Sequence, residues 1–128
     1  MQGETENWLE QAGSDYKDAR LLWENHRYGG AILFYQQAVE KILKGYIVEH
    51  KKKVPTKTHK VEFLLKEADL DISDLDLKTG VEELSKSYIR VRYPDLSRQY
   101  YRKREKSELL VKLAEQLYLW VKGKFKNH

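Results

Sequence analysis

The sequence predicts an all-α protein, built as an up-and-down four-helix bundle with one additional short helix. Apolar residues recur at spacings of three and four along most of the 128-residue chain, as on the buried face of a helix. Charged residues make up 34% of the chain, which fits a small helical domain with solvated outer faces. Neither an internal repeat nor a Pro/Ser-rich linker divides the chain, so we expect residues 1–128 to form a single domain.

The first two helices are expected to form an antiparallel pair. The first should run from about Glu6 to His26, and the second, from about Ala31 to Lys51, is the most apolar segment and is expected to be central. Gly29 and Gly30 break the pattern and predict a tight turn between them. Glu40 and Lys44 lie four apart on the second helix, in the order that favours a surface ion pair.

Three shorter stretches complete the helical pattern. Thr58 is the expected N-cap of a third, short helix over about His59 to Ala68, with His59 packing at its start and bonding locally. After an acidic connector, a fourth helix is expected over about Leu77 to Ile89, and a last one over about Ser107 to Phe125.

The composition excludes several kinds of site. The chain contains no cysteine, which excludes disulfides and zinc–thiolate sites, and no His/carboxylate group has the spacing of a metal site. We therefore expect neither a metal ion nor a cofactor. No apolar run approaches the roughly 20 residues that span a bilayer, and no signal-peptide pattern is present, so we expect a cytoplasmic protein without membrane contact. The net charge of +4 favours an anionic partner only weakly.

An arginine- and tyrosine-rich segment is the strongest functional signal. Five of the seven arginines lie between residues 90 and 104, interleaved with tyrosines, whereas most of the remaining positive charge is lysine. Arginine binds phosphate bidentately and stacks on rings, and tyrosine stacks on bases, so this composition favours a surface for RNA or a nucleotide. A solvated basic surface, or arginines paired with Asp71, Asp74 and Asp76, is the alternative. The expected binding residues are Arg90, Arg92, Tyr93, Asp95, Arg98, Tyr101 and Arg102.

Three motifs together resemble the HEPN domain family. They are the stretch QQAVEKILK on the second helix, the stretch PTKTH before the third, and the stretch RYPD after the fourth, in this order and with the family's spacing. The resemblance covers nearly the whole chain. It implies a bundle of four to five helices, a homodimer and an association with RNA or nucleotides. It also implies a possible partner, because single-domain members are often paired with a minimal nucleotidyltransferase in a two-component, toxin–antitoxin-like module.

The sequence departs from the ribonuclease motif of that family. In ribonuclease members an Arg is followed, after four to six residues, by a His. The corresponding positions after Arg92 are Ser97, Arg98 and Gln99, and no histidine occurs between His59 and His128. We therefore lean toward a protein that is not an enzyme. Arg92 and Tyr100 are the weak catalytic candidates, and His59 is a second possible replacement for the missing base.

Three hypotheses follow from the sequence. The first is a module that binds RNA or a nucleotide, working with a nucleotidyltransferase. The second is a metal-independent ribonuclease toxin whose sequence departs from the Arg–His motif of the family. The third is a protein-interaction subunit whose arginines meet an acidic partner surface instead of a nucleic acid.

Overall fold

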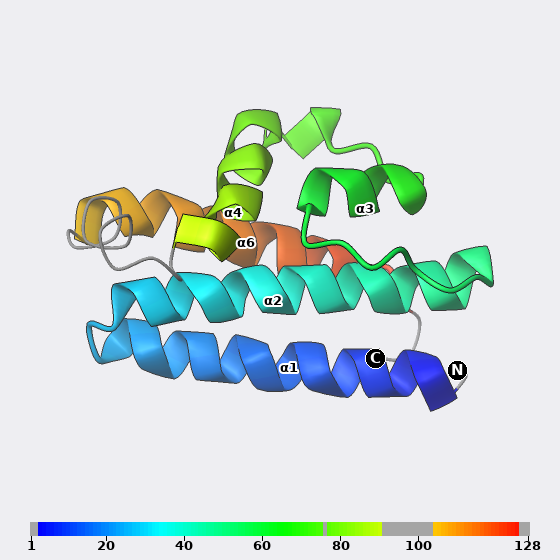
Figure 1. Ribbon diagram of the computed structural model, residues 1–128, viewed down its shortest axis with the longest axis horizontal. Coiled ribbons are helices and arrows are strands. Elements are labelled where there is room, and N and C mark those ends of the chain that lie inside the picture. Colours follow the sequence, from blue (N-terminus) through cyan, green and yellow to red (C-terminus); the bar gives the residue numbers. More distant parts are fainter. Residues whose placement is uncertain (1–2, 76, 91–103, 126–128) are drawn as a thin grey trace.

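The computed structural model describes residues 3–75, 77–90 and 104–125, and all regular structure in these residues is helical. The all-α class and the bundle are thus as the sequence predicts. Figure 1 shows that α1, α2 and α6 lie alongside one another. α4 crosses α2 steeply, and α3 covers part of the outer face of α2. The elements are α1 (Gly3–Glu24), α2 (Tyr28–Tyr46), a π-helical segment η1 (Ile47–Lys51), α3 (Val61–Glu67), a 3₁₀ turn η2 (Ser73–Leu75), α4 (Lys78–Arg90) and α6 (Arg104–Lys122).

The turn between α1 and α2 lies earlier than predicted. His26 takes a left-handed φ of 62°, and the backbone N–H of Arg27 donates to the carbonyl of Leu22 at 2.8 Å, closing α1. Gly29 and Gly30 belong to the first turn of α2, so the prediction of a glycine turn was wrong. The left-handed residue of the turn is instead a histidine, His26. The two helices still run antiparallel (Figure 1).

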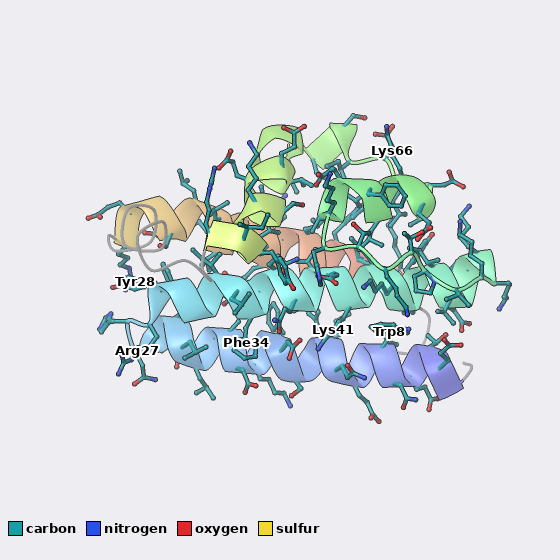
Figure 2. All side chains as sticks on the ribbon, viewed as in Figure 1. Trp8, Arg27, Tyr28, Phe34, Lys41 and Lys66 are labelled. Atoms are coloured by element: carbon teal, nitrogen blue, oxygen red, sulfur yellow. The ribbon has the colours of Figure 1, made fainter. Side chains whose placement is uncertain are left out.

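α2 is the central helix, as predicted, because it packs against α1, α3, α4 and α6. Gly45 allows α1 to approach it closely, since a Cβ at this position would lie 3.1 Å from Cβ of Trp8. Figure 2 shows Trp8, Phe34 and Lys41 along the seam between the two helices. The helix contributes the largest share of the core, through Ala31, Ile32, Tyr35, Ala38, Val39, Ile42 and Leu43.

α3 begins at Val61, which is later than the sequence predicts, and Thr58 is not its N-cap. The hydroxyl of Thr58 instead accepts the N–H of Lys60 at 3.2 Å, ahead of the helix. The cap function comes from α4, where the Ser85 hydroxyl accepts the buried N–H of Val61 at 2.8 Å and donates to the Glu62 carboxylate at 2.6 Å. This arrangement fixes the start of α3 against α4.

α4 and α6 agree with the predicted fourth and last helices to within three residues at each end. Gly80 lies where α4 meets α6, and a Cβ there would lie 1.9 Å from Cδ1 of Leu113. Together with α1 and α2 these helices make up the four-helix bundle, and α3 is the additional short helix. Among the described helices, none combines the length and the apolar character that crossing a bilayer requires.

Candidate nucleic-acid interface

A buried polar network lies on the face of α2 that α3 and its preceding loop cover. The Glu40 carboxylate accepts a hydrogen bond from Nε2 of Gln36 at 2.9 Å and from Nζ of Lys44 at 3.0 Å. The Glu40 and Lys44 side chains are only 8% and 11% exposed. The predicted ion pair therefore forms, but the prediction that it lies on the surface was wrong, because the loop before α3 folds over this turn of α2.

His59 completes the network from that loop. Its Nδ1 lies 3.1 Å from both carboxylate oxygens of Glu40, and its carbonyl accepts from Nε2 of Gln36 at 3.2 Å. These contacts join residues 19 and 23 positions apart, so the expectation that His59 bonds only locally was wrong. A buried carboxylate that holds one imidazole nitrogen fixes the orientation of the ring.

The second contact of His59 is with Tyr88 on the last turn of α4. The two rings are stacked, with centroids 3.7 Å apart and planes inclined by 14°. Although it is held on two sides, the His59 side chain remains 51% exposed. It faces a groove of about 550 Å³ between the loop before α3 and α4. The groove is lined by Lys57, Thr58, His59, Lys60, Glu62, Glu82, Ser85, Lys86, Tyr88 and Ile89.

The groove combines aromatic rings with a small excess of positive charge. Three lysines line it against two glutamates, and one of these, Glu62, accepts the hydrogen bond from Ser85. Lys86 lies 3.6 Å from Glu83, an ion pair of the exposed kind that contributes little energy, so its charge stays available to a ligand. Cations beside a stacked aromatic pair suit a phosphate attached to a planar or sugar group.

Arg90 ends α4 and begins the arginine- and tyrosine-rich segment. Its guanidinium donates to the Glu83 carboxylate at 2.7 Å, and this hydrogen bond holds the pKa of Glu83 below its usual range. The alternative was that arginines pair with the acidic connector. At Asp71 the structure shows another partner, because its carboxylate accepts the backbone N–H of Ser73 at 2.9 Å. The side chains of Asp74 and Asp76 lie outside the described structure.

Most of the predicted binding residues fall in residues 91–103, outside the described part of the chain. These are Arg92, Tyr93, Asp95, Arg98, Tyr101 and Arg102, together with the catalytic candidate Tyr100. The structure describes the two ends of the segment. Arg90 lies at one end, and at the other Arg104 places its guanidinium carbon 4.9 Å from the ring centroid of Trp23.

The run of three lysines at residues 51–53 is also tied down by carboxylates. Lys51 pairs with Asp69, and Lys53 lies 3.6 Å from the Glu67 carboxylate, so this lysine run anchors the loop that leads from η1 to α3. Hydrogen bonds from Thr56, followed by the charge of Lys53, lower the pKa of Glu67 against the opposing effect of burial. In the described residues no three His, Asp or Glu side chains gather in a way that could hold a metal ion.

Comparisons with known proteins agree with the resemblance seen in the sequence. Among curated proteins none matches significantly. A solved structure, that of TT1696 from Thermus thermophilus, is 29% identical, with a TM-score of 0.79 over 97% of this chain and 100% of that one. The sequence profile of the HEPN domain matches residues 5–124, nearly the whole length. The chain therefore belongs to the HEPN domain family.

Proposed function

We propose that this protein binds RNA or a nucleotide, using the groove around His59 together with the segment 90–104, which follows α4 in the chain. Membership of the HEPN family supports a role connected with nucleotides or RNA. The observation that carries the proposal is the course of α4. Its last turns supply Lys86 and Tyr88 to the groove, and the same helix ends at Arg90, where the arginine- and tyrosine-rich segment begins.

The chemistry of the segment suits a single-stranded polynucleotide. Arg90, Arg92, Arg98 and Arg102 would hold phosphates, and Tyr93 or Tyr101 would stack on a base. Asp95 would orient a neighbouring guanidinium. Because phosphate contacts release counterions, binding through this segment would weaken steeply with added salt.

The assembly is part of the proposal. We propose a homodimer that pairs two such segments, and a separately encoded minimal nucleotidyltransferase as its partner in a toxin–antitoxin-like module. Both statements follow from what the resemblance to single-domain HEPN proteins implies. Light scattering of the pure protein tests the dimer. Co-purification with a nucleotidyltransferase encoded next to it, when both are expressed together, tests the partner.

The decisive experiment is one incubation of pure protein with end-labelled single-stranded RNA, divided between a native and a denaturing gel. Arg92→Ala and Arg98→Ala are compared with Arg27→Ala, which removes the same charge at the exposed turn between α1 and α2 (Figure 2). We expect a band shift that both segment variants weaken and the control keeps. If both segment variants bind as wild type does, with the same salt dependence, the segment is not the binding surface. If the protein instead retains an acidic protein and no RNA, the interaction-subunit hypothesis replaces this one.

A metal-independent ribonuclease is the second candidate function, and one observation favours it. The Glu40 carboxylate orients His59 in a groove with cationic residues, which is the arrangement of a general base, so His59 replaces Tyr100 as the first candidate for the missing group. Arg92 would stabilise charge on the phosphoryl group. Cleavage on the denaturing gel that is lost in both His59→Gln and Arg92→Ala would establish this activity, and intact RNA after long incubation would remove it.

A further inference from the structure

The contacts of His59 determine which of its nitrogens carries a proton. A carboxylate only accepts hydrogen bonds, so the 3.1 Å contacts of Nδ1 with both Glu40 oxygens require a proton on Nδ1. Lys44 already balances the charge of Glu40 at 3.0 Å, and the two side chains are about nine-tenths buried. In a neutral ring with Nδ1 protonated, Nε2 bears the lone pair and can only accept.

Because Glu40 occupies Nδ1, Nε2 is the ring nitrogen left to a ligand in the groove that His59 lines. One face of the ring lies on Tyr88, the Nδ1 edge points to buried Glu40, and the side chain is nevertheless 51% exposed. Among the described residues Nε2 has no hydrogen-bond partner. The ring is held by Glu40 at Nδ1 and by Tyr88 on one face, and the bond from Gln36 to the His59 carbonyl at 3.2 Å fixes the backbone that carries it. His59 thus presents a fixed hydrogen-bond acceptor to the groove.

The surroundings define the ligand that would satisfy this acceptor. Lys57, Lys60 and Lys86 line the same groove and favour a phosphate. A ligand that fits both features must carry an anionic group and, a short distance away, a hydroxyl or amine that donates. A ribonucleotide unit has this pair of groups in its phosphate and its ribose 2′-hydroxyl, whereas a deoxyribonucleotide lacks the donor.

We propose that Nε2 of His59 accepts a hydrogen bond from a ribose 2′-hydroxyl, so that the groove selects ribonucleotide units over deoxyribonucleotide units. This inference rests on the proposed function, because it names the substrate class of the same surface. It assigns a separate task to each part of the surface. Lys57, Lys60 and Lys86 supply affinity for phosphate, and the Glu40–His59 pair supplies the choice of sugar.

The test compares wild-type affinity for three labelled single-stranded oligonucleotides of the same uracil-containing sequence: RNA, its 2′-deoxy form and its 2′-fluoro form. The 2′-fluoro sugar keeps the shape of ribose but cannot donate. We expect RNA to bind about fivefold more tightly than the other two, the value of one net hydrogen bond. Because this comparison uses the unaltered protein, it does not depend on whether any variant folds.

A variant then assigns the preference to His59. In His59→Phe a ring remains to stack on Tyr88 while Nε2 is lost, so RNA affinity should fall to that of the 2′-deoxy form, whose own affinity stays unchanged. His50→Phe is the matched control, because His50 also stacks on a tyrosine, Tyr46, with centroids 4.2 Å apart, and does not line the groove. We expect this control to keep the fivefold preference.

The outcomes separate the inference from the proposed function. If wild type binds all three oligonucleotides equally, or if His59→Phe weakens them all by the same factor, the inference is overturned and the binding function stands. If RNA and 2′-fluoro RNA bind equally but better than the 2′-deoxy form, sugar shape is recognised and not the hydroxyl, which also overturns it. If wild type binds none of the three, the inference is overturned and the proposed binding of RNA fails with it.

Discussion

The imidazole of His59 lies flat against the phenol ring of Tyr88, with centroids 3.7 Å apart. The contact ties the loop before α3 to the last turn of α4, two segments 29 residues apart in sequence. Through Nδ1, on its edge, the same imidazole is hydrogen-bonded to Glu40 of α2. The loop before α3, α4 and α2 therefore meet at one half-exposed side chain that lines the groove.

The stack should contribute measurably to stability. Tyr88→Leu keeps an apolar side chain but removes the ring, and we expect it to lower the free energy of unfolding by about 1 kcal/mol, the usual worth of an aromatic pair beyond its buried area. Tyr88→Phe retains the ring and should lose less. Urea denaturation followed by circular dichroism gives both values. Equal losses in the two variants would show that the ring stack contributes nothing.

Glu40 should contribute far more to stability than an exposed glutamate does. Glu40→Gln leaves the Lys44 ammonium buried without its carboxylate, so we expect a loss of about 3 kcal/mol in the free energy of unfolding. Glu10→Gln is the control, because Glu10 is exposed on α1, and it should change stability by less than about 0.5 kcal/mol. Urea midpoints that coincide for the two variants would refute a buried network.

The hydroxyl of Ser85 should behave as the N-cap of α3 supplied from another helix. Ser85→Ala leaves the buried N–H of Val61 without an acceptor, and we expect a loss of about 1–2 kcal/mol. Hydrogen exchange at the Val61 amide should accelerate in the variant more than exchange in α1 does. Ser14→Ala, at an exposed position of α1, should leave both quantities unchanged. Unaltered protection at Val61 would show that the cap is dispensable.

Helical periodicity sufficed to predict the fold, because it depends only on which face of each helix is buried. The boundaries of α4 and α6 illustrate this. The errors arose where distant residues override local chemistry. Thr58 has the side chain of an N-cap, but Ser85 takes that role from 24 residues away. Gly29 and Gly30 have the freedom a turn needs, but His26 adopts the left-handed conformation instead.

The candidate site was only partly predictable. The spacing of Glu40 and Lys44 indicates that they pair, since both lie on one face of a helix, but spacing alone cannot show that a loop 15 residues later buries the pair. The same holds for His59, whose partners Glu40 and Tyr88 come from two other elements. The arginine-rich segment is a compositional prediction, and of its binding residues the structure describes Arg90.

A cluster of three tyrosines, of which Tyr35 and Tyr118 are buried and Tyr16 is partly buried, should limit the stability of the protein at alkaline pH. Tyr16 stacks on Tyr118 with centroids 4.2 Å apart and meets Tyr35 edge-on. Burial, reinforced by the Glu115 carboxylate that accepts the Tyr16 hydroxyl at 3.4 Å, raises the pKa of Tyr16 to about 12. The same two causes raise the pKa of Tyr35, and burial raises that of Tyr118. All three rings are therefore held in the neutral form by the folded state.

The direction of the pH effect follows from the difference between these raised pKa values and the ordinary pKa of tyrosine in the unfolded chain. In the unfolded chain tyrosine ionises near pH 10, so above about pH 10 the unfolded state has bound fewer protons than the folded state, and the free energy of unfolding falls as pH rises further. We expect it to be constant with respect to these groups below about pH 9 and lower at about pH 11. Tyr16→Phe removes one such group and should make the decrease smaller, whereas Tyr28→Phe, outside the cluster, should leave the decrease as in wild type. Urea denaturation of the three proteins at both pH values measures this, and an identical decrease in Tyr16→Phe and wild type would show that the cluster does not control alkaline stability.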